Sequence, residues 1–156
     1  MEIDSIPIFK PQSVLEFKDD RITAVDFLNK RSYVIGDSKG TVSMYEINPD
    51  KSSSRLLDEI KVGKSKITKI AALGAGNLMV AVIMDSNLYL VDFPKKASEL
   101  ILKGAINFYY WQGESTFPKF LVISKGNKSN VHAYKLNFDA QTLAKVFDLQ
   151  KVQFVA

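Results

Sequence analysis

Lysine is the residue type whose spacing in this chain could support a function. Several lysines surround one expected loop between strands and two more follow a proline, and together they are Lys61, Lys64, Lys66, Lys69, Lys95 and Lys96. Clustered ammonium groups attract carboxylates, phosphates and anionic lipids, and each is worth about 1 kcal/mol close to an anionic membrane. The sequence therefore predicts a basic rim that binds acidic protein partners or an anionic membrane. Ordinary solvated loops would have the same composition.

Two glycine-containing segments have part of the pattern of a nucleotide site. Gly63-Lys64-Ser65 matches the end of a phosphate-binding loop, which also needs a glycine five residues before Gly63 and a helix after it. That earlier position is Asp58, and the following residues predict a strand. Gly74-Ala75-Gly76 lacks the third glycine of a dinucleotide turn and indicates a hairpin. We therefore expect no nucleotide cofactor.

Groups that could perform catalysis or bind a metal are scarce. The chain has no cysteine and a single histidine, His132, so a thiolate or multi-histidine metal site is excluded. His132 lies in a predicted strand without a recognisable nucleophile partner, and we interpret it as structural rather than catalytic. No paired carboxylates indicate acid–base chemistry. The sequence thus predicts a non-catalytic protein without metal or cofactor, and an enzyme is the weakest alternative.

The largest aromatic cluster is Phe108-Tyr109-Tyr110-Trp111. In a strand, Phe108 and Tyr110 would lie on one face and Tyr109 and Trp111 on the other. We interpret both pairs as core packing, in preference to a platform on which bases stack. A net charge of +4 is also too weak by itself to indicate nucleic acid. Neither nucleic acid nor a small-molecule substrate is expected as a partner.

Short β-strands that recur three times would position these residues. Each repeat contains a strand, an apolar strand, a turn and a further strand, and the repeats begin near Ile22, Ile67 and Ile106. A four-stranded unit that recurs every 40–50 residues or so is typical of a propeller blade. Residues 78–84 are almost wholly apolar, as expected for a strand that is covered on both faces.

We therefore predict an all-β fold, a partial β-propeller of about three four-stranded antiparallel blades. The expected blades are residues 21–62, 66–103 and 105–149, within a single domain of residues 1–156. The alternative is a β-sandwich, whose strands recur at similar intervals. Because propellers close with about 4–8 blades, we expect this chain to be an incomplete propeller and a fragment of a longer protein.

The first repeat, SVLEFKDDRITAVDF followed by YVIGDSKGTVSMYEI, resembles the citron-homology (CNH) domain. The closest form is that of the vacuolar-sorting tether subunits of the HOPS and CORVET complexes. Matches to the family's hairpin pattern are Gly36, Asp37, Gly40, Val42 and Tyr45, with Asp37 where threonine is commoner. The second repeat, KITKIAALGAGNLMVAVIMDSNLYLVDF, is also similar to the family. In the third repeat Lys103-Gly104-Ala105, Lys125 and Tyr134 match, while residues 126–130 read as an insertion.

This resemblance implies a protein-interaction module of an endosome or vacuole tethering complex that acts in vesicle trafficking. The implied partners are other tether subunits and Rab-type GTPases. The alternative is a WD40-like scaffold in an unrelated complex, such as a kinase-associated CNH domain. The N-terminus lacks the pattern of a signal peptide and no apolar run approaches the ~20 residues of a membrane span, so we expect a cytoplasmic protein. The resemblance implies that it is peripheral to an endosome or vacuole membrane.

Overall fold

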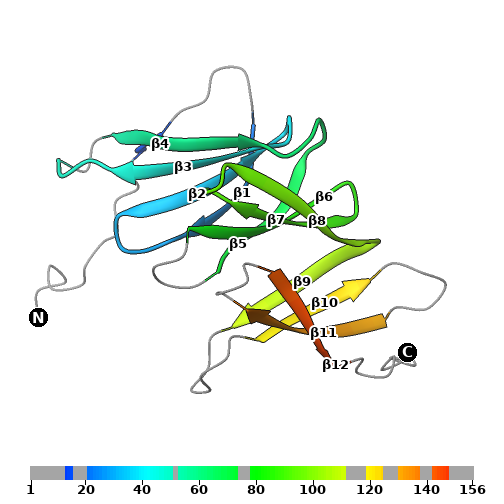
Figure 1. Cartoon of the computed structure of the whole chain (residues 1–156). Helices are drawn as coiled ribbons and strands as arrows, with labels where there is room; N and C mark the ends of the chain where they lie inside the picture. Colours follow the sequence, from blue (N-terminus) through cyan, green and yellow to red (C-terminus); the bar gives the residue numbers. More distant parts are fainter. Residues whose placement is uncertain are drawn as a thin grey trace, which may run out of the picture.

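In the computed structural model of this chain every regular element that is described is a β-strand (Figure 1). The structure describes residues 13–15, 21–50, 53–73, 78–111, 119–124, 130–137 and 142–147. The all-β prediction is therefore confirmed. The sequence predicts a strand, or alternatively a short helix, at residues 55–62, and the structure has a strand at Ser54–Lys61.

The strands form three four-stranded antiparallel sheets, and each strand pairs with the next one along the chain. The first sheet contains β1 (Ile22–Phe27), β2 (Ser32–Asp37), β3 (Thr41–Ile47) and β4 (Ser54–Lys61). The second contains β5 (Ile67–Ala72), β6 (Met79–Met84), β7 (Asn87–Asp92) and β8 (Ala97–Lys103). The third contains β9 (Ala105–Trp111), β10 (Lys119–Ser124), β11 (Asn130–Asn137) and β12 (Thr142–Phe147).

Turn chemistry explains where two of the hairpins reverse. After β2, the Asp37 carboxylate accepts hydrogen bonds from the amides of Lys39 and Thr41 at 2.9 and 3.0 Å, and Gly40 adopts a φ of 87°. Between β6 and β7, Asp85 and Ser86 have φ values of 55° and 56°, so both are left-handed in a two-residue connection. Both turns lie where the sequence predicts them.

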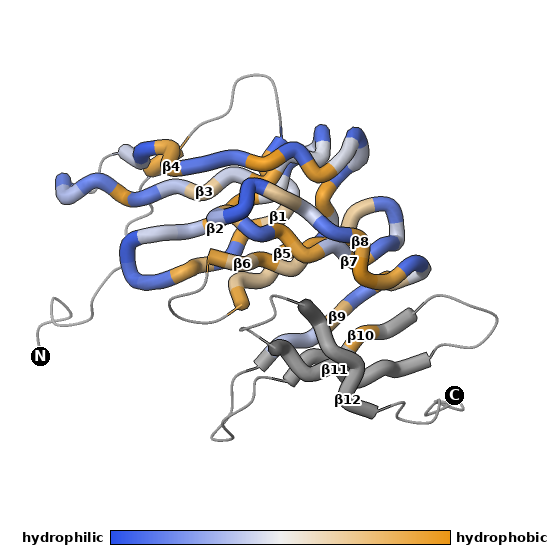
Figure 2. Tube along the Cα trace, viewed as in Figure 1, coloured by the Kyte–Doolittle hydropathy of each residue, from blue (hydrophilic) through white to orange (hydrophobic). Residues whose placement is uncertain are grey.

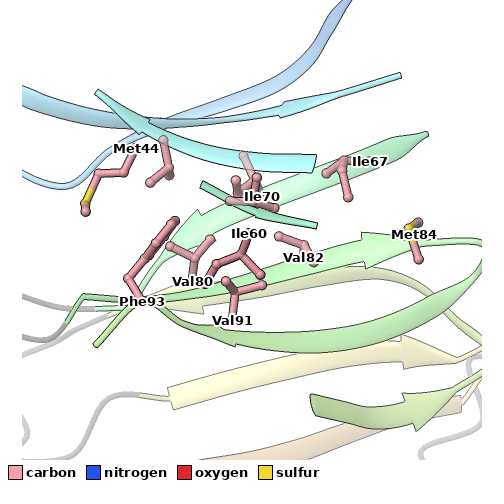
Figure 3. Packing of buried hydrophobic residues seen from close by; sticks show 11 residues of the cluster. Met44, Ile60, Ile67, Ile70, Val80, Val82, Met84, Val91 and Phe93 are labelled. Carbon is pink, nitrogen blue, oxygen red and sulfur yellow. The ribbon is translucent and has the colours of Figure 1, made fainter. Parts of the chain in front are cut away.

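The second sheet is covered on both faces, as the apolar run at 78–84 predicts, and all six residues of β6 are buried. One set of side chains packs between the first and second sheets (Figure 3): Val34, Val42, Met44, Ile60, Ile67, Ile70, Val80, Val82, Met84, Val91 and Phe93. A separate set packs between the second and third sheets: Leu73, Met79, Ala81, Ile83, Leu88, Leu90, Ala105, Phe108 and Val122. Alternate residues of β6 therefore contribute to two different interiors.

The first two sheets approach most closely where β5 lies against β1 and β2. The Ala72 amide of β5 donates a hydrogen bond of 2.8 Å to the Asp26 carboxylate of β1. Gly36 of β2 faces the fully buried Ile67, and a Cβ atom at position 36 would lie 2.6 Å from the Cβ of Ile67. A glycine is required there because no side chain fits between the two sheets.

The other face of the first sheet has a smaller apolar cluster. Tyr33, Ile35 and Tyr45 are buried there, and Val14 and Leu15 are among the partly buried residues that pack on them. The rings of Tyr33 and Tyr45 stack with their centroids 5.7 Å apart. The sequence also predicts short strands at residues 13–18 and 152–155; residues 13–15 belong to no strand, and residues 16–18, 125–129 and 152–155 lie outside the described part.

We predict that Gly36→Ala lowers the free energy of unfolding by about 1–3 kcal/mol, because its methyl group would overpack the rigid, β-branched Ile67. Urea denaturation measures this loss. Gly63→Ala is the matched control and should cost less, since its new methyl group meets the flexible end of Met84. Equal losses for the two variants would contradict the proposed packing.

Candidate interaction surface

Successive turns of an antiparallel meander alternate between its two ends, and this divides the predicted lysines. The β4–β5 connection places the exposed Lys61, Lys64 and Lys66 at the same end as the β2–β3 and β6–β7 turns. These connections gather at the right of the view in Figure 1, and Figure 2 shows that they are hydrophilic. Lys95 and Lys96 lie in the β7–β8 turn, at the opposite end of the sheets.

Hydrogen bonds join the connections of the first end into one surface. The amides of Val62 and Gly63 donate to the Gly40 carbonyl at 2.9 and 3.3 Å, and the Lys61 ammonium donates to the Lys39 carbonyl at 2.9 Å. The Ser65 hydroxyl and the Asp85 carboxylate are 3.0 Å apart, which links this group to the β6–β7 turn. Lys61, Lys64 and Lys66 thus belong to an ordered loop cluster.

Three further cations lie at this end that the sequence analysis missed. Arg21 precedes β1 and exchanges hydrogen bonds with Ser38 of the β2–β3 turn at 3.3 and 2.9 Å. Lys39 lies within that turn, and Lys103 ends β8 next to Gly104. We call the six exposed residues the basic end: Arg21, Lys39, Lys61, Lys64, Lys66 and Lys103. The alternation of turns in a meander is the signal that would have found all six.

Lys69 takes part in a contact between sheets instead of contributing to this surface. Its ammonium lies 5.5 Å from the ring centroid of Phe108 and 5.0 Å from that of Tyr109, so β5 contacts β9 through cation–π interactions. Phe108 is fully buried, as predicted, but Tyr109 is 54% exposed, so the expected burial of both faces of β9 is wrong at this residue. The side chain of Trp111 lies outside the described residues.

The opposite end carries charges of both signs. The Lys96 ammonium lies 3.6 Å from the Asp58 carboxylate, and the Arg55 guanidinium lies 3.2 Å from that of Glu46. Lys95 is exposed, and its amide donates to the Asp92 carboxylate at 3.1 Å. The structure therefore does not place Lys95 and Lys96 in the same surface as Lys61, Lys64 and Lys66.

A hollow of about 460 Å³ lies at the basic end, between the second and third sheets. Its lining residues are Ser65, Lys66, Thr68, Ile83, Asp85, Ser86 and Ile106. The Thr68 hydroxyl donates to the Ile83 carbonyl at 3.2 Å, and Ser65 is already paired with Asp85. The hollow therefore brings a cation, a carboxylate, hydroxyl groups and two isoleucine side chains together without an activated nucleophile.

Tyr45 is one described residue whose pKa is shifted from its ordinary value. Burial, with smaller effects from Tyr33, Glu59 and Asp37, raises the pKa of the Tyr45 hydroxyl, so it stays protonated at neutral pH. Among the described residues no three histidine, cysteine or acidic side chains converge as metal ligands. Within the same residues no helix has the length and apolarity to cross a bilayer. The side chain of His132 lies outside the described part.

Comparison with known proteins adds no relative to this description. A scan against protein-family models found no match, and a search of the curated proteins found no similar sequence. The CNH resemblance therefore rests on the sequence motifs alone.

We predict that Lys69→Met lowers the free energy of unfolding by about 0.5–1 kcal/mol, because the aliphatic chain remains while the cation–π contacts with β9 are lost. Chemical denaturation measures the change. Lys95→Met, at an exposed turn, is the matched control and should leave stability nearly unchanged. The same loss in both variants would contradict a specific role for Lys69.

Proposed function

We propose that this chain is a β-propeller segment of the CNH type and acts as a non-catalytic protein-interaction module. The observation that carries the proposal is the second sheet, which is covered on both faces by sheets of the same four-stranded topology. Neighbouring blades of a propeller bury one another in this way. A β-sandwich encloses one interior between two sheets, whereas this chain has apolar clusters on both sides of one sheet.

The way in which such a module would act follows from its architecture. Stacked sheets form a rigid scaffold, and the connections at their ends present side chains to a partner without a change of fold. Here hydrogen bonds order connections at both ends of the sheets, such as Val62 to Gly40 and Lys95 to Asp92, so a partner would meet a preformed surface and lose little affinity to loop ordering.

The partners follow from the resemblance of the motifs around Gly36, Gly40 and Tyr45. We propose that the module belongs to an endosome or vacuole tethering complex of the HOPS or CORVET type. There it would contact other tether subunits and recognise a Rab-type GTPase during vesicle trafficking, on the cytoplasmic side of the membrane. A WD40-like scaffold of an unrelated complex remains the alternative.

We predict that the immobilised chain retains endosomal or vacuolar Rab-type GTPases more strongly when they carry a non-hydrolysable GTP analogue than when they carry GDP. A switch protein exposes its effector surface only in the triphosphate state, so an effector discriminates between the two states. Interferometry with matched GTPase preparations measures the difference. Equal binding of both forms across the panel would reject the GTPase role, and specific capture of a protein kinase would favour the alternative scaffold.

A further inference from the structure

The two ends of the sheets differ in charge far more than the net charge of +4 suggests. All six cations of the basic end are exposed. Of the acidic residues in its turns, Asp37 is buried and accepts hydrogen bonds from backbone amides, while Asp85 is exposed, keeps its charge and accepts a hydrogen bond from Ser65. The opposite end, by contrast, mixes cations with Glu46 and Asp58 in ion pairs. Positive potential is therefore concentrated on one surface of the molecule.

Exposed apolar side chains lie beside these cations. Ile22, next to Arg21 at the start of β1, is 43% exposed. Ile106, near the start of β9, is 47% exposed and lines the hollow together with Lys66. Both are branched aliphatic residues at the same end of the first strand of their sheets. The basic end thus combines cations with apolar groups that could enter a membrane interface.

We propose that the basic end is a docking surface for an anionic lipid bilayer. The cations lie in neighbouring connections of two sheets, so they can meet many headgroups at once. Lysine and arginine bind the negative surface of a cytoplasmic leaflet, and apolar side chains between them add area buried in the headgroup region. An acidic protein that binds the same cations is the outcome that the competition measurement below separates from a bilayer.

The proposal explains how the module would be oriented on a membrane. With the basic end towards the lipid, the opposite end with Lys95 and Lys96 points away from the bilayer and stays open to other molecules. The inference does not depend on the GTPase partner proposed above. Lipid binding and GTPase binding are measured with separate probes, so failure of one is distinguishable from failure of the other.

Sedimentation with vesicles tests the surface directly. The full chain is mixed with phosphatidylcholine vesicles that are either neutral or contain about one third phosphatidylserine. We expect binding to the anionic vesicles only, with a marked loss at high salt because screening shortens the reach of surface charges. Binding of equal strength to neutral vesicles, or none to either kind, would overturn the proposal.

A pair of charge-matched variants locates the binding surface. Lys64→Gln with Lys66→Gln should weaken partitioning about 25-fold, since each lysine near an anionic surface is worth about fivefold. Lys95→Gln with Lys96→Gln removes the same charge from the opposite end and should change partitioning little. Equal losses of vesicle partitioning in the two double variants would overturn the assignment. They would show that the vesicles respond to the total charge of the protein and not to the basic end.

A third variant tests the apolar contribution. Ile106→Ser leaves the charge unchanged and should weaken binding to anionic vesicles severalfold, with an unchanged salt dependence. Thermal unfolding of each variant checks that the sheets are intact. If soluble acidic peptide or nucleic acid competes fully with the vesicles and Ile106→Ser has no effect, the surface is a general polyanion site and the lipid proposal fails.

Discussion

The structure depends on the burial of the second sheet from both sides. β6 has no polar face, and Val80 and Val82 pack towards the first sheet while Ala81 and Ile83 pack towards the third. This sheet therefore cannot keep its apolar surface from water without both neighbours. Polar residues are absent from β6 itself, whereas β4 and β8, further from this centre, carry charged residues such as Asp58 and Glu99.

Close approach between the first two sheets determines which connections meet. Gly36 lets β5 come against β2, and the carbonyl of Gly40 accepts hydrogen bonds from the start of the β4–β5 connection. The β2–β3 turn is thereby held against the connection that leads from the first sheet to the second. The basic end is a product of this packing, because the cations that it brings together are far apart in the sequence.

Local pattern was sufficient to predict most of the described strands and the two-sided cover of β6, because apolar runs and turn residues are local signals. Only three of the six cations of the basic end could be predicted from the sequence. Lys61, Lys64 and Lys66 are neighbours along the chain, but Arg21, Lys39 and Lys103 join them through strand direction, which a search for lysine clusters ignores. The contact of Lys69 with Tyr109 could not be predicted, since it depends on how two sheets are placed in space.

The connection between β6 and β7 contains only Asp85 and Ser86, and this short connection affects how the two strands are aligned. In a sheet with one solvent-exposed face, a register shift of one residue is unfavourable because it exposes apolar side chains to water. β6 is apolar on both faces, so such a shift would place other apolar side chains in the same two interiors. Hydrophobicity alone therefore does not select the correct register. The short reversal at Asp85 and Ser86 leaves no slack between the two strands. In this hairpin, alignment is therefore selected by backbone geometry rather than by solvent.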